Sequence, residues 1–396
     1  RRDRLADAAA AISSFRALLE ESPGDREALD ALDALLVSEK SWYDLAEVLG
    51  HKLDAAASDD ERLALRLRLG KIARTENQDV PTAIEHFERA VARAPDSEEA
   101  IAALNDIGRD EEHRLRVFDI LEPVLRHRGR WQDLLELREL KLKAMADPHA
   151  RVEELGAIAD LHERALGRPA EAFGAHLRAV REEAPSPAAI DAAQRLAVQL
   201  DRWADVCEAL GVKAKATADA QAAGALWILA GGIAEAQIDD VDRAVAAYRA
   251  ALDAGAPEAE PLEALDRLYT RLERWEALLE VLERKMNATP DPVEQSRIEL
   301  RIGRVRLERY QDVPGAISAM RNVLERTPDD GEATTMLEAL WNQADHIPAL
   351  LEILAPVYRA RNDNRKLLDL MDLRVEGMQD AGDRVVDPER VLFAAR

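Results

Sequence analysis

The strongest constraint on this chain is that its sequence repeats. RWADVCEALGVK begins at 202 and RWEALLEVLERK begins at 274, so the two segments superimpose at an offset of 72. Two more copies, SWYDLAEVLGHK and RWQDLLELRELK, begin at 41 and 130. A fixed period of this kind predicts a stack of similar structural units rather than one closed globular core.

An added segment interrupts the period. Trp42 and Trp131, which lead the first two copies, differ in position by 89, which is one period of 72 plus 17. The addition can be located, because VFDILEPVL after Arg114 already matches LLEVLERKM after Trp275. The same event recurs at NRKLLDLMDLRVEGM, which follows IPALLEILAPVY at an offset of 17. We therefore expect an extra single helix near 130–146 and another near 363–380.

Three periods of 72 and one segment of 17 make a longer repeat with an offset of 233. At this offset the chain aligns with itself without a gap, and QDVP at 78 falls on QDVP at 311. About 49 of the 163 overlapping positions are identical, which is roughly 30%. We therefore expect one continuous stack over 1–396, with one super-repeat at 1–233 and part of a second at 234–396.

The segments between turn signals have the pattern of helices that are packed on one side. Apolar residues such as Ile84, Phe87 and Val91 recur every three or four positions. The breaks APDSEE, TPDDGE and SPGDRE place proline after one helix, and Asp, Ser or Gly at the start of the next. No useful stretch alternates with period two. We predict an all-α superhelix of about 22 antiparallel helices without a sheet.

One helix of the period resembles the second helix of a tetratricopeptide repeat. In that family the helix carries Ala, then a large residue four positions later, a small residue three positions after that, and Pro five positions further on. This chain has the full spacing at Ala83, Phe87, Ala90 and Pro95. The preceding helix should carry a small residue where the two helices touch. This place is occupied by Gly70, Ala159, Gly231 and Gly303. The Trp-led pairs look like degenerate members of the same family.

The resemblance implies both an assembly and a function. A helix pair of this size cannot bury its own apolar stripe, so pairs stack into a right-handed superhelix whose first helices line a concave surface. We expect a non-catalytic scaffold that binds partner proteins, or its own copies, through this groove and its edges. No enzyme activity and no cofactor are expected.

Two other functions stay open at this point. The chain can be a regulatory or sensor arm of a larger multidomain enzyme or signalling protein whose catalytic part lies outside 1–396. A helical-repeat RNA binder would need a basic groove, whereas 54 basic and 77 acidic residues give a net charge of −23. Such a surface repels a phosphate backbone, so we expect protein partners and no nucleic acid.

Composition also bears on the compartment. The longest uncharged apolar stretch, from Ala222 to Ala234, has about 13 residues and is shorter than the roughly 20 that span a bilayer. The first residues do not have the pattern of a secretory leader. We expect a soluble protein without membrane insertion, cytoplasmic rather than periplasmic or extracellular. We also expect a piece of something longer, because the chain starts at Arg1 and stops at Arg396.

No residue pattern indicates catalysis or a metal site. Cys207 is the single cysteine and corresponds to Ala46 and Leu279 in other copies, so we interpret it as a core residue rather than a reactive thiol. Among the eight histidines only His113 and His346 recur at the offset of 233. Both lie where a helix begins, which favours capping or a local ion pair over metal ligation.

Two predicted helices are basic, although the chain as a whole is acidic. LALRLRLGKIAR at 63 and RIELRIGRVRLER at 297 are rich in arginine, and they place cations at equivalent positions, namely Arg68 with Arg301 and Lys71 with Arg304. In the tetratricopeptide family, residues beside the small Gly of a first helix tend to face the groove. These four residues are therefore candidates for binding acidic segments of a partner. The alternative is that they pair with acids on adjacent helices.

Overall fold

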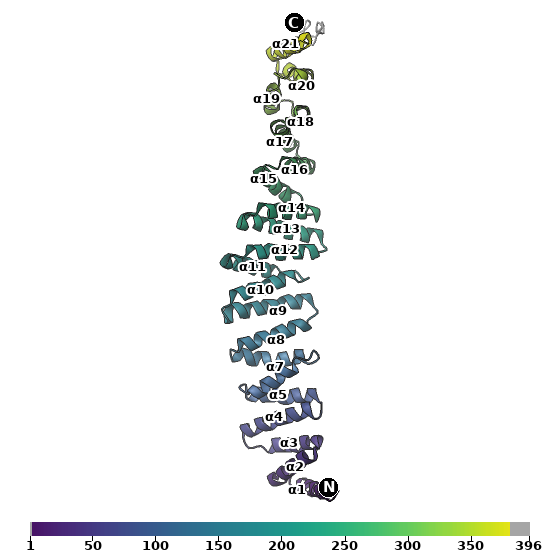
Figure 1. The fold of residues 1–396 in the computed structure, drawn as a ribbon, viewed down its shortest axis with the longest axis vertical. Coiled ribbons are helices and arrows are strands. Elements are labelled where there is room, and N and C mark those ends of the chain that lie inside the picture. Colours follow the sequence, from purple (N-terminus) through teal and green to yellow (C-terminus); the bar gives the residue numbers. More distant parts are fainter. Residues whose placement is uncertain (1, 381–396) are drawn as a thin grey trace. The chain divides into compact units, whose positions relative to one another are not determined.

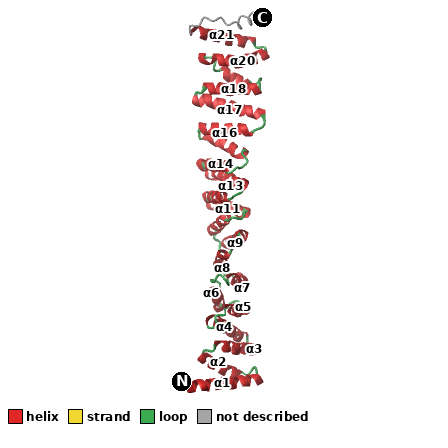
Figure 2. Ribbon diagram, turned by 90° about the vertical axis from the view of Figure 1, so that its right-hand side faces the viewer, coloured by secondary structure: helices red, strands yellow, loops and turns green. Residues whose placement is uncertain are grey.

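The chain is helical throughout the part that the structure describes. The computed structural model describes residues 2–380, which form 21 α-helices joined by short loops (Figures 1 and 2). No strand occurs in this range. The all-α prediction is therefore confirmed. None of the described helices combines the length and the apolar character that crossing a membrane requires.

The chain divides into two compact units, 1–201 and 202–396. The helices of the first unit are α1 (Arg2–Glu21), α2 (Arg26–Glu39), α3 (Trp42–Ala55), α4 (Asp59–Thr75), α5 (Val80–Arg93), α6 (Glu98–Ile107), α7 (Arg114–His127), α8 (Trp131–Ala144), α9 (Pro148–Asp160), α10 (Pro169–Arg181) and α11 (Pro187–Leu200). A short π-helical turn, η1 (Leu161–Ala165), extends α9. The division falls at Asp201 and not at 233, and the single continuous stack stays a prediction.

The second unit shows the same alternation of helices. Its helices are α12 (Trp203–Ala216), α13 (Ala220–Ile233), α14 (Val241–Asp253), α15 (Ala259–Arg271), α16 (Trp275–Ala288), α17 (Pro292–Tyr310), α18 (Val313–Arg326), α19 (Gly331–Glu338), α20 (Ile347–Arg361) and α21 (Asn364–Asp380). The π-helical η2 (Ala234–Ile238) follows α13, and the 3-10 turn η3 (Ala344–His346) precedes α20. Helices occupy both places where the extra helix is expected, as α8 and α21.

Helix starts are set by the side chains that the turn signals predicted. Asp25, Ser97 and Asp330 are the N-cap residues of α2, α6 and α19. Each side chain accepts a hydrogen bond from the amide three residues later, at 3.0, 3.4 and 2.8 Å respectively. Such a cap satisfies one of the amides that the first helical turn leaves without a partner.

The turns that precede the four Trp-led helices α3, α8, α12 and α16, and the turn that precedes α21, share one backbone conformation. In each, the residue two positions before the helix-leading residue has a positive φ, which is typical of a helix C-terminus that reverses the chain. These residues are Lys40 (φ 59°), Gly129 (67°), Asp201 (54°), Glu273 (53°) and Asn362 (56°). The repeat in sequence is therefore also a repeat in backbone geometry.

The small residue of the first helix lies where the two helices of a pair touch. A Cβ atom added to Gly70 in α4 would lie 2.7 Å from the ring of Phe87 in α5. At the equivalent place in α13, a Cβ on Gly231 would lie 3.0 Å from the ring of Tyr248. Both distances are too short for carbon atoms in contact. The predicted role of these glycines is confirmed.

The core of each unit extends from one helix pair to the next. In the first unit one cluster of buried side chains joins Phe87 of α5, Leu104 of α6, Leu121 of α7 and Leu134 of α8. A similar cluster in the second unit includes residues of α17 to α21. Neither cluster is confined to a single helix pair, so burial depends on the next helices in the stack.

Truncation of Phe87 to Ala should lower the free energy of unfolding of the first unit by about 3–5 kcal/mol, because a large ring is lost from a packed crossing. Phe87 is 1% exposed, whereas Tyr43 of α3 is 75% exposed and serves as the control. Tyr43→Ala should change stability by no more than about 0.5 kcal/mol. Urea unfolding followed by circular dichroism measures both, and equal losses would contradict the packing described.

Candidate functional site

Arg68 lies in an ionic cluster that joins three helices of the first unit. Its guanidinium donates two hydrogen bonds to the carboxylate of Asp33 in α2, at 2.6 and 2.5 Å. Lys52 of α3 donates to the same carboxylate at 2.9 Å. Asp33 is buried, so one carboxylate holds cations from α3 and α4 against α2.

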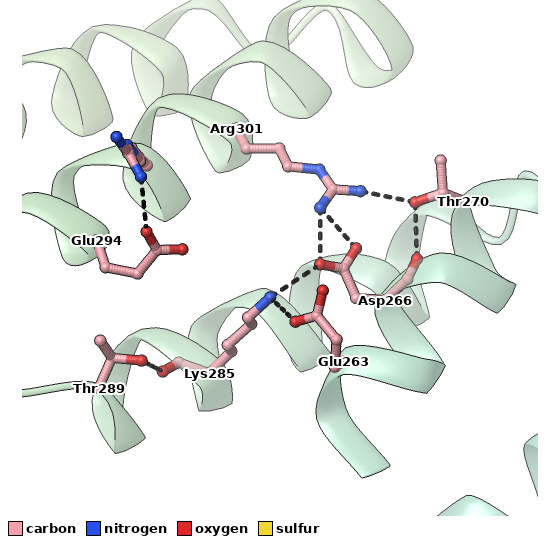
Figure 3. A network of polar contacts seen from close by, with 8 residues as sticks. Glu263, Asp266, Thr270, Lys285, Thr289, Glu294 and Arg301 are labelled. Carbon is pink, nitrogen blue, oxygen red and sulfur yellow. Dashed lines mark hydrogen bonds and ion pairs between the residues drawn. The ribbon is translucent and has the colours of Figure 1, made fainter. Parts of the chain in front are cut away.

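The second unit contains the same cluster. Arg301 of α17 donates to Asp266 of α15 at 2.7 Å and to the hydroxyl of Thr270 at 2.7 Å (Figure 3). Lys285 of α16 lies 3.4 Å from Asp266 and also pairs with Glu263. Asp266, Lys285 and Arg301 correspond to Asp33, Lys52 and Arg68 at the offset of 233. The arrangement is therefore a fixed part of the super-repeat.

Lys71 and Arg304 are also paired within the chain. Lys71 of α4 forms an ion pair with Glu99 of α6, and Arg304 of α17 forms one with Glu332 of α19. Their side chains stay 60% and 48% exposed. Exposed pairs of this kind contribute about 0–1 kcal/mol, so these two pairs add little to the stability of the fold.

All four candidate cations thus have acid partners on adjacent helices, which is the alternative that the sequence left open. Arg68 and Arg301 hold buried carboxylates, whereas Lys71 and Arg304 lie in exposed pairs that bridge neighbouring helices of the stack. Binding of a partner by these residues stays a prediction.

Sequence reasoning missed the acids at the centre of the clusters. The signal was present, because Asp33 and Asp266 are identical at the offset of 233. The four tryptophan-led segments also all end in lysine ten positions after the tryptophan, at Lys52, Lys141, Lys213 and Lys285. With 77 acids in the chain, single acidic residues did not stand out.

The extra helix α8 is secured by a buried ionic cluster. Arg138 of α8 donates to Glu154 of α9 at 2.6 Å and to Glu122 of α7 at 3.1 Å. Lys141 also donates to Glu154, at 2.8 Å, and lies 4.0 Å from the centre of the Phe118 ring. Charges placed on three successive helices fix how α8 lies between its neighbours.

The remaining candidates for chemistry are structural or unassigned. Cys207 is buried and its thiol donates to the carbonyl of Ala230 at 3.5 Å. Burial raises the pKa of this thiol, so it is a poor nucleophile and the core interpretation is confirmed. His113 and His346 are the N-cap residues of α7 and α20, but neither imidazole accepts an amide there, so side-chain capping is wrong and the local ion pair stays a prediction. Among residues 2–380 no group of His, Cys, Asp and Glu is arranged to hold a metal ion.

Comparison with known proteins supports the resemblance found in the sequence. The family model described as tetratricopeptide repeat matches residues 262–295, which contain most of α15 and all of α16. This pair is one of the Trp-led pairs. The predicted tetratricopeptide resemblance is confirmed there by a match to the family itself.

Two solved structures show similarity to the chain. A tetratricopeptide repeat protein from Parabacteroides merdae is 14% identical, with 70% of this chain and 97% of that chain covered and a TM-score of 0.21. A structure of Naa15/Naa10 bound to HypK-THB is also 14% identical, with 91% of this chain and 65% of that chain covered and a TM-score of 0.22. No curated protein matches the chain.

Replacement of Asp33 by Asn should cost about 1–3 kcal/mol of stability at neutral pH, because Arg68 and Lys52 lose the negative charge and one of the two oxygens that accept from them. Burial by itself raises the pKa of Asp33, but the hydrogen bonds and charges of Arg68 and Lys52 outweigh it and lower the pKa overall. A lowered pKa stabilises the fold above the unfolded pKa, and this contribution is lost as the pH falls below about 4.

The difference in unfolding free energy between wild type and Asp33→Asn should therefore shrink on acidification. Asp59→Asn is the matched control, because Asp59 pairs with Arg93 at 2.6 Å on the exposed surface, where solvent screens the two charges and the pair adds little to stability. Urea unfolding at a series of pH values measures both. If the loss of unfolding free energy in Asp33→Asn does not shrink on acidification, the ionised carboxylate of Asp33 is not the source of the stabilisation.

Proposed function

We propose that this chain is a non-catalytic scaffold that binds other proteins through the surfaces of its stacked helices. The observation that carries this proposal is the repeat itself. The described residues form helix pairs that recur in sequence, in turn geometry and in ionic contacts. The tetratricopeptide match at 262–295 supports it, since stacks of such repeats provide extended binding surfaces.

The face formed by α2, α4 and α6 is the proposed contact surface of the first unit. Arg68 and Lys71 link α4 to α2 on one side and to α6 on the other. In the second unit Arg301 and Arg304 link α17 to α15 and α19 in the same way. We propose that Lys71 and Arg304, the more exposed cations, exchange their internal acids for carboxylates of an acidic partner segment.

Affinity purification from cells that naturally produce the protein tests the scaffold function. The tagged chain should recover at least one protein partner in stoichiometric amount, or form a defined assembly of its own copies in gel filtration. Recovery of no partner together with a monomeric chain would exclude the proposal.

The double variant Lys71→Glu/Arg304→Glu reverses both charges. It should bind the recovered partner about tenfold or more weakly than the wild type, which corresponds to about 1.4 kcal/mol of binding free energy. The reason is that two attractive charges on the contact surface become repulsive. Isothermal titration calorimetry with the purified partner measures the change.

The swapped variant Lys71→Glu/Glu99→Lys separates contact from structure, because it restores the internal pair with its charges exchanged. If Lys71 contacts the partner directly, the swap should leave partner affinity reduced. Full recovery of affinity by the swap would mean that Lys71 acts only by holding α4 against α6.

A further inference from the structure

Three basic groups on α4 and α5 lack the acidic partners that most of their neighbours have. One terminal nitrogen of Arg66, Nη1, is enclosed by protein and has no hydrogen-bond partner, and the same holds for Nδ1 of His86. Arg89, one turn from His86 on α5, is exposed, and the ion pairs that α5 forms within residues 2–380 involve Glu88 and Arg93 instead. We call Arg66, His86 and Arg89 the Arg66 site.

The three groups lie close enough for their charges to act on one another. Burial, and then the charge of Arg89, lowers the pKa of Arg66. Burial, and then the charges of Arg66 and Arg89, lowers the pKa of His86, while the exposed Glu85 acts weakly in the opposite direction. The site is therefore a cationic position in which desolvation and mutual repulsion are uncompensated within the chain.

Other cations on the same helices are compensated. Arg68 and Arg74 of α4 pair with acids of α2 and α6, and Arg93 of α5 pairs with Asp59 at 2.6 Å. Arg66 is two residues from Arg68, and residues with this spacing do not share a helix face. The Arg66 site therefore lies away from the face on which Arg68 and Lys71 link α4 to its neighbours.

The second unit shows what fills the equivalent position there. At the offset of 233, Arg66, His86 and Arg89 correspond to Glu299, Ala319 and Asn322. The carboxylate of Glu299 is buried and accepts from the amide of Asn322 at 3.0 Å and from Arg326 at 3.5 Å. One copy of the position thus holds an internal carboxylate among donors, whereas the other holds donors without a carboxylate.

We propose that the Arg66 site binds a carboxylate side chain of an acidic segment of a partner protein. The site rests on the scaffold function proposed above and adds a second contact on another face of α4. Arginine presents paired donors whose geometry matches a carboxylate. A carboxylate is favoured over other oxyanions, because Glu299 occupies the equivalent position in the second unit.

A synthetic peptide of alternating Glu and Ser residues is the probe, and the full chain labelled with ¹³C in its histidines is the reporter. The ring signal of His86, assigned by its loss in His86→Gln, should shift saturably as the peptide is added. Arg66→Gln should raise the half-saturating concentration about tenfold. Arg93→Gln, which removes a cation that is paired with Asp59, should leave it within about twofold.

A second variant distinguishes a loss of peptide binding at the Arg66 site from a loss that is caused by misfolding. Arg66→Glu/His86→Ala/Arg89→Asn reproduces the pattern of Glu299, Ala319 and Asn322 and keeps Arg93 where the second unit has Arg326. It should retain the unfolding midpoint of the wild type and bind the peptide at least about tenfold more weakly in isothermal titration calorimetry, which does not need the His86 signal. Binding of the peptide by this variant with wild-type affinity would overturn the proposal.

Two further arms identify the ligand class. A peptide with Gln in place of Glu should cause no shift, and inorganic phosphate should bind more weakly than the Glu peptide. Binding of phosphate without binding of the Glu peptide would overturn the assignment to carboxylate. Failure of the scaffold function is distinguishable, because the wild-type chain would then recover no partner at all, whereas failure of this site alone would leave partner recovery equal for wild type and the triple variant.

Discussion

The structure depends on the close approach of the two helices in each pair. Gly70 lets the ring of Phe87 come so near that a single added carbon would collide with it. A helix pair of this kind has more apolar surface than it can cover by itself. The core therefore has to continue from α5 through α6 and α7 to α8. The long repeated sequence is a direct consequence of that requirement.

Ionic clusters then determine how successive pairs lie on one another. Apolar packing alone tolerates small shifts between helices, whereas a buried carboxylate such as Asp33 has to meet its donors at hydrogen-bond distance. Asp33 is held by donors from α3 and α4, and Asp266 by the equivalent donors from α16 and α17. The same residues at the same offset give each unit the same local register, which presents the exposed cations at regular places on the surface.

Sequence predicted what repeats and missed what depends on pairing in space. The helix starts at Asp25 and Ser97 and the contact of Gly70 were predictable, because each follows from local spacing that recurs along the chain. The partners of Arg68 and Lys71 were not, since many acids were available and only the stacking shows which of them lies opposite. The Arg66 site was hidden for another reason. Its signal is a charge reversal at the offset of 233. A comparison that looks only for identical residues between copies does not detect such a change.

The stability of each helix comes from its contacts with neighbouring helices and not from one core shared by a whole unit. Hydrogen exchange on the full chain carrying Leu104→Ala tests it most directly, because Leu104 of α6 is fully buried. Amide protection should fall in α6 and in the adjacent α5 and α7, and should be retained in α2 and α10. A uniform loss of protection over α2 to α11 would contradict it.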